Sequence, residues 1–303
     1  MTRDGFPKCI ALATDLSHRC DRAFDRALLV AQAWRAELMV IHALNPPEDG
    51  MLSVRLGDLP SWRRPLEDPV RAARHRIYHD LVREAPPIDI SVHVETGSPA
   101  PVVLDIAGKG EAGLIVTGVA RDGPLARMLL GDTVDRLIRK APVPILIVRD
   151  RAFEPYRAMV VATDFSAPAR IALETAVRFF PDAAISLFHA YDVPFAGYLG
   201  RSEIERQFEG YGEAAADKFL AEAGLSDVAA RNVTRMIEHG VPEALLRDRA
   251  ENAARHLTVV GTHGGGLVYE AMIGSTARKI LDAVPGDVLL VPDPARRKVN
   301  PAG

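Results

Sequence analysis

The feature that most constrains the fold of this 303-residue chain is an internal repeat. Three pairs of segments carry it in an unchanged order: ATDLS at 13–17 with ATDFS at 162–166, LMVIHA at 38–43 with ISLFHA at 185–190, and PILIV at 144–148 with DVLLV at 287–291. The offset between paired positions falls only from 149 at the first pair to 143 at the last. Chance matches would not stay in register, so the sequence predicts two tandem domains, 1–150 and 151–303.

Each copy alternates short apolar runs with segments of helical periodicity, which is typical of an α/β fold. In the first copy we expect strands at 8–14, 37–43, 88–95, 114–117 and 144–148, and helices at 19–33, 69–84, 99–109 and 132–140. The second copy repeats this series from Arg157 to Val291. The pattern predicts a five-stranded parallel sheet with helices on both faces in each copy. Ligands of such folds bind outside the carboxyl ends of the strands.

Composition limits the classes of function open to the chain. Hydrophobic residues make up 48%, charged residues 25%, and the net charge is −3, as in a soluble globular protein. The lysines and arginines are dispersed, so nucleic acid is not an expected partner. No apolar run approaches the roughly 18 residues of a membrane span. Two cysteines without metal spacing, Cys9 and Cys20, fit a reducing compartment. We therefore expect a cytoplasmic protein that binds neither nucleic acid nor membrane.

The pattern with the most chemical content is a glycine-rich loop in the second copy. Gly261 and Gly264 follow an apolar run, and after nine further residues Gly274 precedes Ser275 and Thr276 at the start of a predicted helix. Glycine lets a backbone approach a ligand closely, and the amides and dipole at a helix N-terminus attract phosphate. The spacing alone leaves two interpretations open: a phosphate-binding loop, and a glycine-rich turn capped by Ser275.

This loop resembles the G-x2-G-x9-G-[S/T] signature of the universal stress protein family. The resemblance covers nearly the whole chain, because both copies share the family's strand order and its aspartate after the first strand, Asp15 and Asp164. It implies two tandem flavodoxin-like or Rossmann-like domains. It also implies ATP, with Mg²⁺ as its accompanying ion, as the ligand of the second copy, and a role in the stress response as a nucleotide-dependent regulator or sensor.

The resemblance assigns site residues in the second copy one by one. Asp164 would face the ribose or the adenine, and Ala190, just after the second strand, would offer backbone contacts to the adenine. The remaining positions would surround the ribose and the phosphates: Gly261, Thr262, Gly264, Gly274, Ser275 and Thr276. Ala277 stands where some members have another hydroxyl residue, which removes one expected phosphate contact.

The first copy departs from this pattern where the phosphates would lie. Gly118 and Gly131 keep the spacing, but Arg121 occupies the second glycine position and Asp132 replaces the phosphate-facing hydroxyl. Asp132 suits a helix N-cap. A carboxylate ~4 Å from a phosphate charge is repelled by about 4 kcal/mol at an effective dielectric of 20, roughly a thousandfold in affinity. We expect weak or no ATP binding there, with Arg121 either offsetting the repulsion or pairing with Asp132.

Other polar residues near the strand ends have local explanations that compete with a ligand role. Asp15 either caps the following turn with Ser17 or holds a different ligand, and we favour the cap. His42 and His189 lie at equivalent strand ends, where they would shape the crevice or make local hydrogen bonds. His263 lies inside the glycine loop, where its titration would couple binding to pH.

Three functional hypotheses follow. The leading one is an ATP-binding regulator with no catalytic residue. A slow ATP hydrolase of the same fold would need a general base, for which Asp164 and His263 are the local candidates, and a structural adaptor would bind no nucleotide. The chain has no P-loop, G-x-S-x-G or H-E-x-x-H motif. His75 and His79 have metal-binding spacing but no evident third ligand, so a solvated helix face is the preferred interpretation and no metal site is assigned.

The resemblance also bears on assembly. Family members commonly dimerise by pairing their last strands across a two-fold axis, and here those strands would be 144–148 and 287–291 of one chain. The tandem arrangement therefore implies an internal pseudo-dimer of the two copies. Pairing of two whole chains is left open.

Overall fold

The computed structural model describes residues 5–44, 68–83, 85–119, 131–192, 201–226, 229, 232–252, 256–262 and 273–294. Within these residues the first copy contains β1 (Cys9–Thr14), α1 (His18–Trp34), β2 (Glu37–Leu44), α2 (Pro69–Ile77), the π-helix η3 (Tyr78–Val82), β3 (Ile90–Thr96), α3 (Pro99–Lys109), β4 (Leu114–Gly118), α4 (Asp132–Lys140) and β5 (Ile145–Val148).

The second copy follows the same alternation. It contains β6 (Ala158–Ala162), α5 (Ala167–Phe179), β7 (Ala184–Tyr191), α6 (Arg201–Glu222), β8 (Val233–His239), α8 (Pro242–Asn252), β9 (His256–Gly261), α9 (Ser275–Ala283) and β10 (Val288–Val291). Both copies are therefore α/β units of the kind that the sequence predicts.

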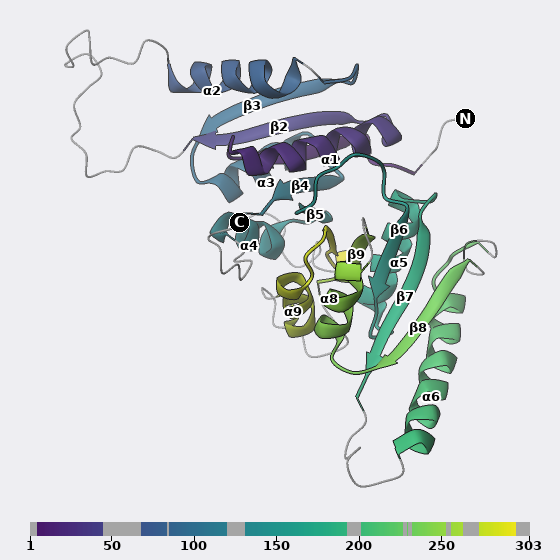
Figure 1. Cartoon of the computed structure of the whole chain (residues 1–303). Helices are drawn as coiled ribbons and strands as arrows, with labels where there is room; N and C mark the ends of the chain where they lie inside the picture. Colours follow the sequence, from purple (N-terminus) through teal and green to yellow (C-terminus); the bar gives the residue numbers. More distant parts are fainter. Residues whose placement is uncertain are drawn as a thin grey trace.

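All ten strands join one sheet, in the order β3-β2-β1-β4-β5-β10-β9-β6-β7-β8 (Figure 1). The five strands of each copy are mutually parallel. The copies meet where β5 and β10 pair antiparallel, with Leu146 opposite Leu289. The prediction of two five-stranded parallel sheets is confirmed, and the two sheets are continuous with each other.

Helices cover both faces of this sheet, and each face has its own core. Ile10 and Leu12 of β1 pack into one core, beneath α1 and α5, whereas Ala11 and Ala13 pack into the other, beneath α3 and α9. Successive strand residues point to opposite faces, so strands buried on both faces become continuous apolar runs. Both cores contain residues of both copies, so the join between the copies is part of the core.

The structure corrects the predicted bounds of the second helix and the third strand. The expected helix 69–84 is an α-helix that ends at Ile77 and a π-helical turn, closed by the hydrogen bond from the Arg83 N–H to the Tyr78 carbonyl, 2.9 Å. The following strand begins at Ile90 rather than at 88, because the Ile88 N–H bonds to the Pro86 carbonyl in a turn. A π-helical turn leaves little signature in helical periodicity.

A buried polar cluster lies beside the β5–β10 join. Asp287 is only 1% exposed. Its carboxylate accepts hydrogen bonds from the Tyr156 hydroxyl at 2.5 Å and from the backbone N–H groups of Arg149 and Asp150 at 2.7 and 3.0 Å. Arg26 of α1 lies 3.3 Å from the same carboxylate. Burial, and then the charge of Asp287, raises the pKa of Tyr156 well above its ordinary value. The cluster joins the two copies through groups that water does not reach.

Candidate functional site

The carboxyl ends of β6 and β9 lie side by side at a topological switch point. β6 pairs with β7 on one side and β9 on the other, so the chain leaves β6 in one direction and later returns on the opposite side. Such a switch point is the usual place for a ligand in an open α/β sheet. Asp164 follows β6 and Gly261 ends β9, so the fold brings these two predicted site residues to one edge.

The turn that follows β6 is held by its own side chains. The Thr163 Oγ1 accepts a hydrogen bond from the Phe165 N–H at 2.8 Å, and Asp164 Oδ1 accepts one from the Ser166 N–H at 3.0 Å. Phe165 adopts a left-handed backbone with φ 62°, which is uncommon for a non-glycine residue. Asp164 is exposed, and one of its carboxylate oxygens is used by this turn.

The turn after β1 repeats this arrangement. Thr14 Oγ1 accepts from the Leu16 N–H at 3.1 Å, Asp15 Oδ1 accepts from the Ser17 N–H at 2.9 Å, and Leu16 has φ 60°. The interpretation of Asp15 as the residue that caps the turn with Ser17 is therefore confirmed. Because Asp164 makes the same bond, retention of the aspartate in both copies does not by itself indicate a ligand.

Asp15 has a side-chain partner, Cys20, whose equivalent in the second copy is Ala169. The thiol of Cys20 donates to Asp15 Oδ1 at 3.0 Å. Burial opposes ionisation of Asp15, but the hydrogen bonds from Ser17 and Cys20 outweigh it, and its pKa lies below the ordinary value. Burial raises the pKa of Cys20 to about 11, so this thiol stays protonated and serves as a donor.

The two equivalent histidines hold the strand ends. His42 Nδ1 lies 2.8 Å from the Thr14 carbonyl, and His189 Nδ1 lies 2.8 Å from the Thr163 carbonyl. A carbonyl only accepts, so each Nδ1 carries a proton. The prediction of local hydrogen bonds for these histidines is confirmed. In the second copy the ring of Phe165 also packs against His189, with centroids 4.4 Å apart.

The ends of the glycine loop are joined at the start of α9. The Gly274 N–H donates to the Thr262 carbonyl at 2.8 Å, and the Thr262 N–H donates to Val291 of β10 at 3.0 Å. Gly274 is the N-cap of α9, and Ser275 and Thr276 are its first two residues, both exposed. The first turn of a helix has amides without intrahelical acceptors. Two hydroxyls and these amides therefore form an anion-attracting surface.

This geometry refines several predicted positions. A turn capped by Ser275 is excluded, because the N-cap is Gly274 and no side chain caps the helix. Thr262 is 2% exposed, so its side chain lies inside the fold. Ala190 is the penultimate residue of β7 rather than the residue after it, since the strand continues to Tyr191. Gly264 and His263 lie outside the described residues, and the whole set of ligand contacts stays a prediction.

The corresponding helix in the first copy is acidic. Gly131 is the N-cap of α4, no side chain caps this helix, and Asp132 is its first residue. The expectation of Asp132 as the N-cap is therefore wrong by one position, since Gly131 already has the extended backbone of a cap, with φ −63° and ψ 153°. Asp132 and Asp135 lie in the first turn, where negative charge stabilises the helix but repels phosphate. Arg121 lies outside the described residues.

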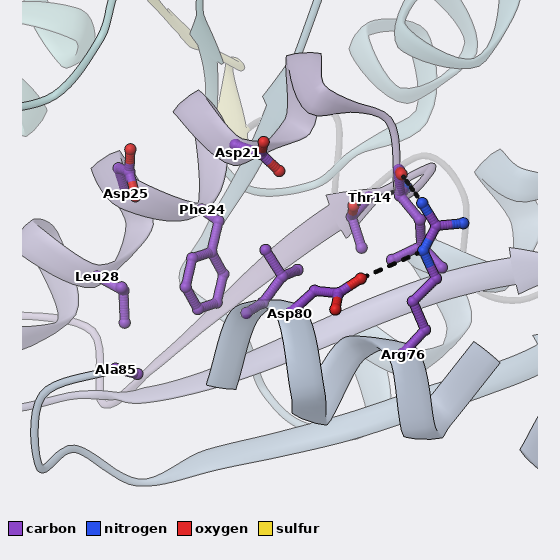
Figure 2. A pocket seen from close by; sticks show the side chains of 10 residues that line it. Thr14, Asp21, Phe24, Asp25, Leu28, Arg76, Asp80 and Ala85 are labelled. Atoms are coloured by element: carbon purple, nitrogen blue, oxygen red, sulfur yellow. Dashed lines mark hydrogen bonds and ion pairs between the residues drawn. The ribbon is translucent and has the colours of Figure 1, made fainter. Parts of the chain in front are cut away.

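The first copy also has a groove between α1 and the α2–η3 segment, with a cavity volume of ≈ 380 Å³ (Figure 2). Phe24 and Leu28 line it, with the carboxylates of Asp21, Asp25 and Asp80. Burial, and then the charge of Asp21, raises the pKa of Asp25. In the second copy, the ring of Phe165, in the turn before α5, packs against Phe219 of α6, with centroids 5.6 Å apart.

His75 and His79 both belong to the α2–η3 segment. Their ring centroids lie 6.3 Å apart, and the exposed His79 Nδ1 lies 3.0 Å from Asp80 Oδ1. No group of three or more metal-ligating side chains occurs among the residues that the structure describes. Within the same residues, no helix is both long and apolar enough to cross a membrane.

Comparison with known proteins agrees with the duplicated fold. A family model described as the Universal stress protein family matches residues 8–149 and again residues 155–292. The chain belongs to the universal stress protein family. A universal stress protein from Thermus aquaticus is 31% identical over 142 residues, which is 47% of this chain and 98% of that protein. The two matched segments make the chain a tandem universal stress protein.

Solved structures agree on the fold across both copies. The crystal structure of a functionally unknown protein from Pseudomonas aeruginosa PAO1 matches with a TM-score of 0.66 and 20% identity, over 96% of this chain and 94% of that chain. A universal stress protein solved in complex with cAMP is 25% identical over 47% of this chain and 96% of that chain, with a TM-score of 0.35. The first likeness shows the fold, and the second is too slight to carry an argument about the site.

Three features of the molecule do not follow from the sequence patterns described above. The left-handed turn residues Leu16 and Phe165 lacked a signal, because neither is a glycine. The groove between α1 and α2 depends on the packing of separate helices. For the cluster around Asp287, the sequence gives a partial indication that the two copies differ at this position, since the repeat aligns Asp287 with Pro144.

Proposed function

We propose that this universal stress protein binds ATP, with its Mg²⁺, in the second copy and acts as a nucleotide-dependent regulator. The observation that carries the proposal is the exposed pair Ser275 and Thr276 in the first turn of α9, joined through Gly274 to the end of β9. Phosphate would lie against the hydroxyls and first-turn amides. Adenine and ribose would lie toward Asp164 and Ala190, at the neighbouring ends of β6 and β7.

The proposal divides the chain into an altered copy, 1–150, and a nucleotide-binding copy, 151–303. The first-turn carboxylates Asp132 and Asp135 of α4 disfavour phosphate by charge repulsion. In this arrangement the β5–β10 pairing makes an internal pseudo-dimer with one site. Cys9 and Cys20 are both free thiols, which fits the cytoplasm as the compartment.

The test is to purify the full chain, denature it and identify the released small molecules by mass spectrometry. Titration calorimetry of the nucleotide-free protein with ATP, AMP and cAMP, each with Mg²⁺, then gives the affinities. We expect ATP both among the released molecules and as the tightest ligand, with Ser275→Asp as the variant that loses it. A structural adaptor would release no nucleotide and bind none, and this result would overturn the proposal.

Hydrolysis is measured in the same preparation as phosphate release. A binding protein shows release at the background rate. Release well above background, lost in His263→Ala, would instead assign the chain to the hydrolases, because His263 lies inside the glycine loop that would contact the phosphates and is a candidate general base.

A further inference from the structure

The phosphate-facing helix of the second copy lacks a positive charge of its own at its C-terminus. The last turn of α9 contains no basic residue, whereas the last turn of its counterpart α4 contains Arg139 and Lys140. The last carbonyls of a helix have no intrahelical donor and carry the negative end of the helix dipole. A cation at this end of α9 must come from elsewhere in the chain.

Arg149, which directly follows β5 of the first copy, supplies this charge. Its guanidinium donates from Nη2 to the Leu281 carbonyl at 2.7 Å and from Nη1 to the Val284 carbonyl at 2.6 Å. Arg149 is 3% exposed, so water does not screen these contacts. The backbone N–H of Arg149 is held by Asp287, and its carbonyl accepts from Arg22 of α1 at 2.8 Å. The charge is therefore fixed in place at the end of α9.

A second contact from the first copy reaches the first turn of α9. Arg278 Nη1 lies 2.5 Å from Asp135 Oδ1 of α4. The two residues occupy equivalent positions of the repeat, at the same offset of 143 that separates Gly131 from Gly274. Two identical copies would place like charges against each other here. The opposite charges instead favour the pairing of one copy with the other.

The Arg149 contact runs in one direction only. The position of the second copy that corresponds to Arg149 is Pro292, and the position of the first copy that corresponds to Asp287 is Pro144. A proline side chain has no donor and no charge, so Pro292 makes no such contact with α4. The helix that receives the external charge is therefore α9, the one whose first residues are Ser275 and Thr276 rather than an aspartate.

We propose that the first copy serves as a built-in support for the nucleotide site of the second, with Arg149 as a positioning residue that fixes α9. This inference rests on the proposed function, because it concerns the affinity of α9 for phosphate. A helix that is fixed at both ends presents its N-terminal donors in one orientation, and preorganised donors bind more tightly than mobile ones. The altered copy thereby contributes to a site that it does not itself contain.

The experiment compares three variants of the full chain. Arg149→Met removes the charge, Arg149→Lys keeps it without the forked geometry, and Trp34→Phe is the matched control. The Trp34 indole donates to the Phe179 carbonyl at 3.0 Å, so the control weakens the same join between copies at α5, away from α9. For Arg149→Met we expect ATP affinity to fall about tenfold, for Arg149→Lys a smaller fall, and for Trp34→Phe no change.

A second readout does not require nucleotide. Hydrogen exchange of the α9 amides in the nucleotide-free chain should be faster in Arg149→Met than in wild type, while the α4 amides exchange as before. If Arg149→Met does not fold, Arg149→Lys carries the same test, because it keeps the charge and loses the forked contact with the Leu281 and Val284 carbonyls. For this variant we expect a loss of ATP affinity of about threefold.

The outcomes separate the two proposals. Wild-type ATP binding that is unchanged in a folded Arg149→Met chain overturns the positioning role and leaves the proposed function standing. An equal loss of affinity in Arg149→Met and Trp34→Phe also overturns it, because a general weakening of the join would then explain both. A wild-type chain that binds no ATP overturns the proposed function and this inference together.

Discussion

The two copies of the repeat agree in the turns that build the crevice and differ in the helices that face it. Thr14 and Asp15 hold the turn after β1 with the same hydrogen bonds that Thr163 and Asp164 make after β6. The helix that follows the glycine loop starts with Asp132 in the first copy and with Ser275 in the second. The turns are thus common to both copies, and the first residue of the helix is where the copies differ.

The first copy, although altered at the start of α4, contacts the corresponding helix of the second copy. The first copy has Asp132 at the position where α9 has Ser275, yet its Arg149 and Asp135 contact α9. The sequence differences at the start of α4 thus leave the shared sheet and the shared core intact.

The largest effect is expected from breaking the join between the copies. Asp287→Ala removes the acceptor of Tyr156 and leaves Arg26 buried without its counter-charge, so the free energy of unfolding should fall by about 3–5 kcal/mol. Urea unfolding measures this. The control Asp282→Ala removes a half-exposed carboxylate that pairs with Arg278 and should change stability by less than about 0.5 kcal/mol. Equal losses in both variants would contradict a special role for the join.

The second-largest effect is expected on ATP affinity, when the first residue of α9 is changed to the aspartate that α4 has. Ser275→Asp places a carboxylate at the start of α9, and ATP affinity should fall about a hundredfold, less than the unscreened repulsion because the position is exposed. Ser275→Ala removes only the hydroxyl and should cost about fivefold. Calorimetry of both variants checks this. Comparable affinities for the alanine and aspartate variants would contradict the charge argument.

The reverse change should give the first copy a site. Arg121→Gly with Asp132→Ser restores the glycine and the hydroxyl while the turn of Thr14 and Asp15 stays as it is. The number of ATP molecules bound per chain should rise from one toward two, with the new site about tenfold weaker because α4 receives no contact equivalent to that of Arg149. A stoichiometry that stays at one would show that the copies differ in more than these two residues.

The smallest effect is a pH dependence that Asp15 of the first copy contributes to stability. The folded state lowers the pKa of Asp15, so its contribution to stability is present above the unfolded pKa of about 3.9 and is lost as pH falls through the folded pKa. Asp15→Asn keeps an oxygen that accepts from Ser17 but does not titrate. The stability advantage of wild type over this variant should shrink between pH 6 and pH 3 in urea unfolding. A constant difference across that range would exclude this contribution.

Much of this architecture could be predicted from the sequence, because it rests on local patterns. The buried strands are continuous apolar runs, and α3 and α4 have the bounds 99–109 and 132–140 that proline, glycine and periodicity indicate. The N-cap residues of the helices are harder to predict from the sequence, because a glycine and the polar residue after it are both favourable caps. At the start of α4 the N-cap is Gly131, not Asp132.

The family resemblance implied that the last strands of the two copies pair, and β5 does pair with β10. The side-chain contacts at this join could not be predicted, because they link residues that are distant in the sequence. Arg149 is separated from its acceptor Leu281 by 132 positions, and no local pattern links them. The mismatch between Arg149 and Pro292 was visible once the repeat was aligned. Only the folded structure shows that Arg149 contacts the C-terminal end of α9 and that Pro292 has no equivalent contact to make.

The most direct test of the difference between the copies is the stoichiometry of ATP binding to the full wild-type chain, measured by titration calorimetry with Mg²⁺. One ATP per chain is expected, with an affinity that Ser275→Asp lowers about a hundredfold and that Asp132→Asn leaves unchanged. Two ATP molecules per chain, or an ATP affinity that Ser275→Asp leaves unchanged, would contradict the assignment of the site to the second copy.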